Sequence, residues 1–249
     1  MNIGLVIGKK TSTGTPGKNI REILGRPSAE YAFIAAKYSK IDRVFVSTDC
    51  PTISEIGRSY GADIIDRPHH LATPDSLTED VLIHAHTHIR QVLGDGVEIN
   101  SISLLFANNP AIHVERLNEA IDKLSSDREA DSCFSVSKYD MFSPVRARKI
   151  ENEEIKPFVD LDLLDNVSSI RDSSGSVYFC DLAIQVMKER CFTDMDSGQL
   201  PFKWQGKKSL AIENDFGFDI DSEWQFIVIE YWLKKHGFTN DEIPWKIND

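Results

Sequence analysis

Residues 1–8 read Met-Asn-Ile-Gly-Leu-Val-Ile-Gly, and residues 9–19 continue with Lys-Lys-Thr-Ser-Thr-Gly-Thr-Pro-Gly-Lys-Asn. The apolar, β-branched run predicts a strand over Ile3–Ile7. The loop that follows is cationic and rich in small residues. Backbone N–H groups of such a loop can hold a polyphosphate with the help of lysine ammonium groups. A merely solvated loop would tolerate the same composition, so the remaining sequence has to distinguish the two interpretations.

The composition is that of a globular protein, with 41% hydrophobic and 27% charged residues in a chain of 249. This length and apolar content predict a single domain over residues 1–249 with a sizeable core. The net charge of −11 argues against a nucleic-acid or anionic-membrane binder, because such proteins carry a basic face. An anionic small molecule would need a local positive pocket.

The sequence contains no apolar run of about 18 residues that would span a membrane, and its first apolar run is too short for a signal peptide. The four cysteines are scattered and form no Cys-x-x-Cys motif, which predicts reduced thiols rather than disulfides or zinc ligands; they are Cys50, Cys133, Cys180 and Cys191. Together these features predict a cytoplasmic protein.

Short apolar runs alternate with helix-patterned segments along most of the chain, which predicts an α/β protein with a mostly parallel sheet and helices on both faces. Strands are predicted over Ile3–Ile7, Arg43–Ser47, Ala62–Ile65, Ile102–Phe106, Ser132–Val136, Ser176–Cys180 and Ser209–Ile212. Helices are predicted over Ser28–Tyr38, Pro51–Tyr60, Pro74–Leu93, Val114–Leu124, Leu182–Arg190 and Ser222–Lys235.

Two of these helices carry end signals. Thr73 is expected to cap the helix that begins at Pro74, and Ser222 and Gln225 are expected to form a capping box for the last helix. The buried stripe of the first of these helices is predicted to consist of Leu77, Val81, Ala85, Ile89 and Val92.

The alternation stops over Lys138–Ile170, which is charged and irregular. This stretch lacks the apolar content to fold alone. We therefore expect an inserted arm over residues 138–170, either a surface excursion or a dimerisation element.

Ligands of open parallel sheets bind at the carboxyl ends of the strands, so the polar residues just past each strand are the candidates for a site. Lys9, Ser12 and Lys18 follow the first strand. Arg67 follows the third strand, and Asp75 lies at the start of a helix. The loop has neither the GxxxxGK[ST] order of a P-loop nor the GxGxxG of a dinucleotide fold.

A second candidate is the pair Asp219 and Asp221 in Phe218-Asp-Ile-Asp. On an extended segment both carboxylates point to the same side, and two hard oxygen ligands suit Mg²⁺, which also takes phosphate oxygens. Alternatively, Asp221 caps the final helix and Asp219 is only solvated.

Taken together, these stretches resemble the CMP-sugar synthetases, the cytidylyltransferases that activate nonulosonic acids such as sialic, legionaminic and pseudaminic acid and, more distantly, 3-deoxy-manno-octulosonate. The resemblance follows chain order and rests on Pro16-Gly-Lys-Asn-Ile20, Arg43-Val-Phe-Val-Ser-Thr-Asp49, Arg67-Pro…Leu71-Ala72…Asp75-Ser76, Asp80-Val…His84-Ala85, Arg171…Gly175-Ser-Val-Tyr178 and Phe218-Asp-Ile-Asp221.

The resemblance implies a Rossmann-like sheet, CTP held by the N-terminal loop, and a homodimer formed through the arm. It implies nucleotide binding by Lys9, Ser12, Lys18, Asn19, Arg67 and Asp75, metal binding by Asp219 and Asp221, and contact with a sugar acid by Asn108, Asn109, Arg171 and Tyr178. Lys9 stands where the family usually has an arginine.

Two stretches depart from the family pattern. In the family the loop usually reads close to A-R-G-G-S-K-G-I-P-x-K-N. In this chain the loop has fewer glycines, and Thr13 stands where a lysine is usual. The adjacent pair Ser12-Thr13 is closer to the octulosonate branch. The usual L-Q-P-T-S-P-L-R is Leu105-Phe-Ala-Asn-Asn-Pro-Ala-Ile112, without its glutamine and arginine. An unusual acceptor, a carboxylate held by other residues, or a changed base preference would each fit these departures.

The function expected from this resemblance is attack of a sugar hydroxyl on the α-phosphorus of CTP, with departure of pyrophosphate. Mg²⁺ on Asp219 and Asp221 would bridge phosphate oxygens, while Lys9 and Lys18 would offset charge on the β and γ phosphates. Two alternatives stay open: a related nucleotidyltransferase with another nucleotide, a sugar 1-phosphate or an octulosonate acceptor, and a non-catalytic nucleotide-binding relative. The general base is also left open.

Overall fold

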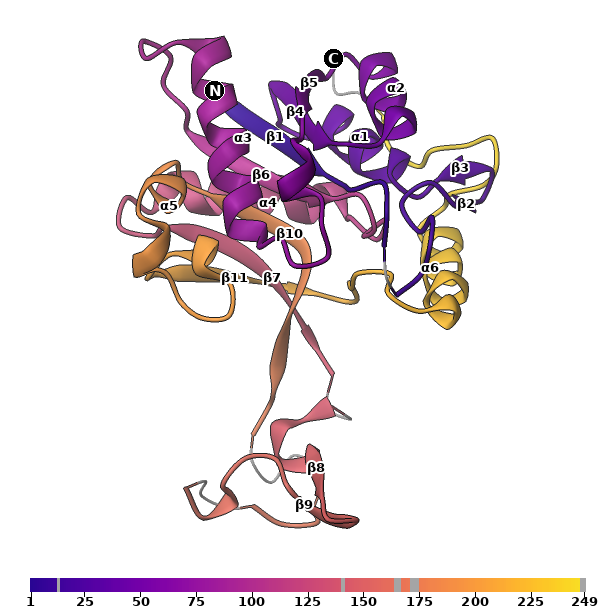
Figure 1. Cartoon of the computed structure of the whole chain (residues 1–249), viewed down its shortest axis with the longest axis vertical. Coiled ribbons are helices and arrows are strands. Elements are labelled where there is room, and N and C mark those ends of the chain that lie inside the picture. Colours follow the sequence, from indigo (N-terminus) through magenta and orange to yellow (C-terminus); the bar gives the residue numbers. More distant parts are fainter. Residues whose placement is uncertain (13, 140–141, 164–166, 171–174, 247–249) are drawn as a thin grey trace.

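A computed structural model describes residues 1–12, 14–139, 142–163, 167–170 and 175–246. Their main feature is a seven-stranded sheet with the strand order β11-β7-β10-β6-β1-β4-β5 (Figure 1). Its strands are β1 (Asn2–Ile7), β4 (Arg43–Thr48), β5 (Asp63–Asp66), β6 (Ser101–Phe106), β7 (Ser132–Lys138), β10 (Tyr178–Met187) and β11 (Ser209–Asn214). β10 runs antiparallel to both of its neighbours and the other pairs are parallel, which confirms the mostly parallel α/β sheet.

The remaining elements are helices and short hairpins. The helices are α1 (Glu30–Lys37), α2 (Pro51–Ser59), α3 (Thr78–Leu93), α4 (Val114–Ser126), α5 (Arg190–Thr193) and α6 (Glu223–Lys235). Two small hairpins pair β2 (Glu22–Ile23) with β3 (Arg26–Pro27), and β8 (Arg148–Glu151) with β9 (Glu154–Pro157). None of the described helices is long and apolar enough to cross a membrane.

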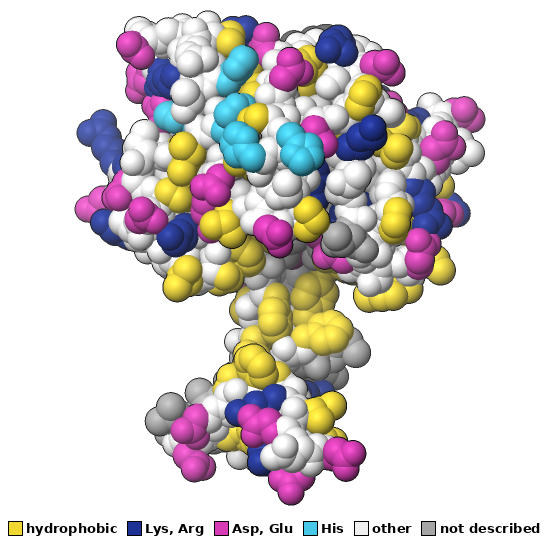
Figure 2. Space-filling view, viewed as in Figure 1, with side chains coloured by type: hydrophobic (Ala, Val, Ile, Leu, Met, Phe, Trp, Pro, Cys, Tyr) yellow, Lys and Arg dark blue, Asp and Glu magenta, His cyan; other side chains and the backbone are white. Residues whose placement is uncertain are grey.

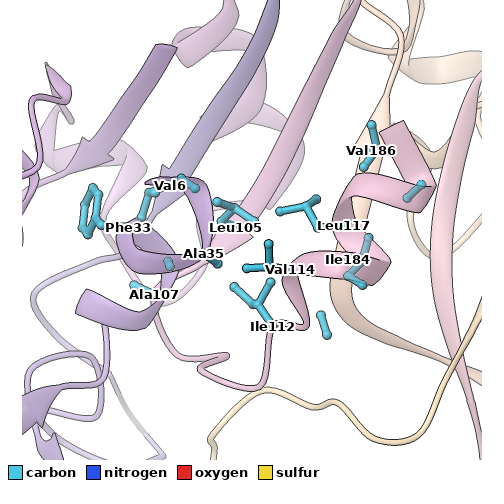
Figure 3. Packing of buried hydrophobic residues seen from close by; sticks show 14 of the residues in the cluster. Val6, Phe33, Ala35, Leu105, Ala107, Ile112, Val114, Leu117, Ile184 and Val186 are labelled. Carbon is cyan, nitrogen blue, oxygen red and sulfur yellow. The ribbon is translucent and has the colours of Figure 1, made fainter. Parts of the chain in front are cut away.

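The central strands are buried on both faces, because helices cover both. On one face Val6 and Leu105 pack against α1, α2 and α4 in a cluster that includes Phe33 and Leu117 (Figure 3). On the other face Leu5 and Leu104 pack against α3 and α5. All six residues of β6 are buried, as the near-continuous apolar run of a central parallel strand requires.

The strand β10 corrects the sequence prediction. A helix was expected over Leu182–Arg190, but this part of the chain continues the strand to Met187 and pairs with both β6 and β7. Ala183, Ile184 and Val186 are fully buried. A short apolar run buried on both faces shows no period that separates a strand from a helix, so the pattern misled the prediction.

The start of α3 also differs. The helix begins at Thr78 rather than Pro74, and the backbone N–H of Thr73 donates to Ser76 Oγ (3.1 Å) in a separate turn. Leu77 and Val92 are exposed, so only the middle of the predicted stripe, Val81, Ala85 and Ile89, is buried. The expected capping box of Ser222 and Gln225 on α6 is confirmed.

The inserted arm leaves the sheet after Lys138 and returns to it at Tyr178, so it extends beyond the predicted end at Ile170. It projects away from the body of the molecule and carries the hairpin of β8 and β9 (Figure 1). The sequence prediction of irregular structure was therefore incomplete. Apolar side chains lie exposed along the arm (Figure 2); those with the largest exposed fractions are Phe142, Ile150, Ile155, Phe158 and Ile170.

Leu105→Ala tests the packing of the central sheet. Leu105 is fully buried on β6, so the truncation should lower the free energy of unfolding by about 2–5 kcal/mol, measured by urea denaturation. Val92→Ala on the exposed side of α3 is the control and should change it by less than about 0.5 kcal/mol. Equal losses in the two variants would contradict the described core.

Candidate active site

The carboxyl ends of β1, β5 and β6 surround a cavity of about 260 Å³. Six of the residues expected at the site line this cavity: Lys9, Lys18, Asn19, Arg67, Asn108 and Asp219. They come from three strand ends, the first loop and the segment that precedes α6. The structure therefore brings these six residues together at the edge of the sheet where open parallel sheets bind ligands.

The loop after β1 is closed by a buried asparagine. Asn19 Nδ2 donates to the Lys9 carbonyl oxygen (2.7 Å), so the two ends of the loop are held together. The Lys9 ammonium group donates to the Thr73 carbonyl oxygen (3.3 Å) across the cavity. Gly17 has a positive φ of 72°, which permits the turn before Lys18.

Lys18 joins this loop to the acidic segment, which is the stretch Asp219–Asp221 before α6. Its ammonium nitrogen lies 2.5 Å from Asp221 Oδ1, and the Thr15 hydroxyl donates to the Asp221 carbonyl oxygen (2.7 Å). The Lys18 side chain is 13% exposed and that of Asp221 68% exposed. The loop and the segment are thus held together by both side-chain and backbone contacts.

Asp219 and Asp221 are placed differently with respect to the cavity. Asp219 lines it, whereas Asp221 stands at its edge beside Lys18. Burial, and then the nearby Asp221 carboxylate, raise the pKa of Asp219 to about 7. A cation bound here would favour the ionised form. The alternative that Asp221 caps the last helix is wrong, because Ser222 takes that position.

Arg67 contributes a buried positive charge. It is 9% exposed and donates from Nη2 to the Ser47 carbonyl oxygen (2.6 Å). Burial lowers the pKa of its guanidinium group to about 10, with the Asp49 carboxylate opposing the shift. Arg67 therefore stays charged at neutral pH, where a buried cation favours an anionic ligand.

The other expected residues do not line the cavity. Ser12 is half-buried, Asp75 is exposed, and Tyr178 is exposed at the base of the arm with its hydroxyl 3.3 Å from Glu213 Oε1. Asn109 is buried, with its amide nitrogen 3.5 Å from Asp219 Oδ1. Arg171 lies outside the described residues. Their predicted roles remain predictions.

Sequence reasoning missed one wall of the cavity. Thr73, Ser76 and Thr78, which all carry hydroxyl groups, line it. Thr73 had been assigned to a helix cap, although its hydroxyl lies 2.8 Å from Ser76 Oγ in the turn before α3. The hydroxyl-rich sequence of this turn was the available signal.

The sheet order and the helices on both faces give a Rossmann-like fold, which solved nucleotidyltransferases share. CMP:2-keto-3-deoxy-manno-octonic acid synthetase, solved in complex with CTP, superposes with a TM-score of 0.66 at 13% identity, over 94% of this chain and 98% of that one. A 4-diphosphocytidyl-2C-methyl-D-erythritol synthase superposes with a TM-score of 0.62 at 12% identity, over 93% and 98%. At these identities the likeness concerns the fold.

The chain belongs to the cytidylyltransferase family, whose model matches residues 3–154. It is 27% identical over 198 residues to CMP-N,N'-diacetyllegionaminic acid synthase of Legionella pneumophila, which covers 76% of this chain and 82% of that enzyme. It is 28% identical over 241 residues to N-acylneuraminate cytidylyltransferase of Oncorhynchus mykiss, covering 96% of this chain and 52% of that protein. The match to N-acylneuraminate cytidylyltransferase B of Danio rerio spans only 27% of its length. The resemblance expected from the sequence is confirmed.

Gly8→Ala tests the close packing beside the cavity. A Cβ at Gly8 would lie 2.6 Å from Ala107 Cβ, which is too close for two atoms fixed to the backbone. We expect a loss of about 1–3 kcal/mol in the free energy of unfolding, measured by urea denaturation. Gly96→Ala, where a Cβ meets no atom within 4 Å, is the control; a stable Gly8→Ala variant would contradict the described strand ends.

Proposed function

We propose that this protein transfers CMP from CTP to a keto-sugar acid of the nonulosonic, sialic-type class and releases pyrophosphate. The observation that carries the proposal is the single cavity that brings the cationic loop residues Lys9 and Lys18 together with Asp219. Family membership and the names of the related enzymes support the choice of CTP and of a sugar acid. We assign the reaction to the cytoplasm.

Mg²⁺ fits the donor set of this site. Asp219 and Asp221 offer hard carboxylate oxygens from one segment, and Mg²⁺ completes its coordination with water and phosphate oxygens. Burial, and then the nearby Asp221 carboxylate, raise the pKa of Asp219, and a bound cation would favour its ionised form. We propose that both hold the ion, which when bound would neutralise phosphate charge and act as a Lewis acid.

The chain's own residues would position the reactants and offset charge. The acceptor hydroxyl oxygen forms a bond to the α-phosphorus as the bond to the pyrophosphate oxygen breaks; pyrophosphate leaves with the electron pair, and the hydroxyl proton passes to solvent. Lys9 and Lys18 line the cavity, where they would face the phosphates, and Asn19 holds the two ends of the loop together. Because these cationic side chains are already in place, the protein does not have to reorganise as negative charge develops on the leaving pyrophosphate.

Asp221→Asn tests the metal assignment. The Asp221 side chain is 68% exposed, so the variant should fold normally, while the turnover number for pyrophosphate release from CTP should fall about a hundredfold or more. Asp215→Asn is the control, because Asp215 lies on the same segment but contacts Trp232 and Lys235 instead of the cavity. Unchanged turnover in Asp221→Asn would rule out the proposed metal ligands.

We further propose a homodimer formed through the arm. Ile150 and Ile155 are 79% and 74% exposed on its hairpin, and Phe158 is 67% exposed beside it. An extended arm with such exposed apolar groups gains most by burying them against a second copy.

Light scattering after gel filtration tests the dimer. The mass should be about twice the 28.1 kDa of one chain, and replacing Ile150 and Ile155 together by Asp should halve it. The matched control, Val92→Asp on α3, places a charge on another exposed apolar position and should leave the dimer intact. A monomeric unsubstituted chain would contradict the proposal.

A further inference from the structure

Asp181 is a buried carboxylate for which the proposed reaction has no use. It lies on β10 and is 4% exposed. Its oxygens accept hydrogen bonds from the Ser135 and Ser137 hydroxyls, Asn214 Nδ2 (3.1 Å) and the Ala183 backbone N–H (3.1 Å). These donors come from three separate strands, so one side chain ties β7, β10 and β11 together.

Asp181 also marks an irregularity in β10. The pairing with β7 shifts register between Cys180 and Gln185, and Leu182 has a φ of 58°. A bulky residue adopts this left-handed conformation only where its surroundings enforce it. Asp181 Oδ1 provides such a constraint, because it accepts the N–H of Ala183 just beyond Leu182. Bulges of this kind are common next to active sites, where they re-aim side chains.

One connection runs from Asp181 to the cavity through Asn109. The amide nitrogen of Asn109 lies 3.4 Å from the Asp181 carbonyl oxygen and 3.5 Å from Asp219 Oδ1. Asn109 is 1% exposed, so its amide is enclosed between these two partners. The backbone of the bulge therefore helps to determine where a hydrogen-bond donor meets the Asp219 carboxylate.

A second connection runs through the chain that leads to Asp219. Asn214 Nδ2 donates both to Asp181 Oδ2 and to the Phe216 carbonyl oxygen (2.8 Å). At Gly217 a Cβ would lie 3.0 Å from Asp181 Cγ and 2.7 Å from Ala183 Cβ. The backbone between β11 and the acidic segment therefore packs closely against Asp181 at Gly217, two residues before Asp219.

We propose that Asp181 is a positioning residue that places the Asp219 carboxylate for cation binding, acting through Asn109 and through the segment Asn214–Gly217. The inference rests on the proposed function, because it assigns a metal to Asp219. A carboxylate suits the position because it only accepts hydrogen bonds, whereas an amide would direct an N–H group at one of the four donors.

The test compares Mn²⁺ binding, measured by electron paramagnetic resonance, in the unsubstituted full-length chain and in Asp181→Asn. Partners that orient a metal ligand typically change metal affinity by 10–100-fold, so Mn²⁺ affinity should fall about tenfold or more. In steady-state assays the Mg²⁺ concentration for half-maximal pyrophosphate release should rise, while KM for CTP should change less than about twofold because the Lys9 and Lys18 loop is untouched.

Asp131→Asn is the matched control. Asp131 lies directly before the first residue of β7, at the end of the strand away from Ser137. Its carboxylate also accepts several hydrogen bonds, from the Arg190 side chain (2.6 Å) and from the backbone N–H groups of Lys207 (2.8 Å) and Lys208 (2.9 Å). Its loss should destabilise the protein to urea and leave Mn²⁺ affinity unchanged. If Asp131→Asn weakens Mn²⁺ binding as much as Asp181→Asn does, the role of Asp181 is structural and the proposal is overturned.

Asn214→Ala provides a second variant should Asp181→Asn fail to fold. It keeps the carboxylate but removes its link to Phe216, and a smaller loss of Mn²⁺ affinity is expected. Unchanged affinity in whichever variant folds overturns the inference about Asp181 alone. If the unsubstituted chain binds Mn²⁺ no better than Asp219→Asn, the proposed metal site itself fails and this inference fails with it.

Discussion

The contact between Lys18 and Asp221 is the constraint around which the site is organised. It joins the first loop of the chain to a segment 203 residues later, and it is reinforced by the Thr15 hydroxyl on the Asp221 backbone. An ion pair with one exposed partner contributes only about 0–1 kcal/mol, so its significance is positional. It brings the lysines proposed to bind phosphate and the candidate metal ligands to one cavity, which neither segment could form alone.

The sheet makes this contact possible. β1 lies between β4 and β6, so the loop that follows it emerges at the middle of the carboxyl edge, where Arg67 and Asn108 arrive from either side. The antiparallel strand β10 and its bulge lie beside the residues that precede Asp219. Asp181 on this strand contacts Asn109 and Asn214. Contacts with the sheet therefore help to fix the position of the acidic segment.

The sequence predicted the sheet well because β-branched runs, Pro-first helices and a capping box are local signals, as Ser222 and Gln225 show. It also predicted six of the residues that line the cavity, because polar residues that follow parallel strands lie at the same edge of the sheet. It failed at β10, where burial on both faces removes any period, and at the turn of Thr73, where side-chain hydrogen bonds replaced the helix start. Asp181 could not be found from the sequence, because its importance lies in donors from β7 and β11 that only the folded chain brings together.

Pyrophosphate release should be measured with CTP and Mg²⁺ across a panel of eight- and nine-carbon keto-sugar acids, with ATP, GTP and UTP run in parallel. We expect release with CTP and at least one nine-carbon acid, and none with the other nucleotides. Release with an eight-carbon acid only, or with a different nucleotide, would contradict the proposed substrates. Silence across the panel in a chain that still binds CTP would contradict the proposed reaction and favour a nucleotide-binding relative without activity.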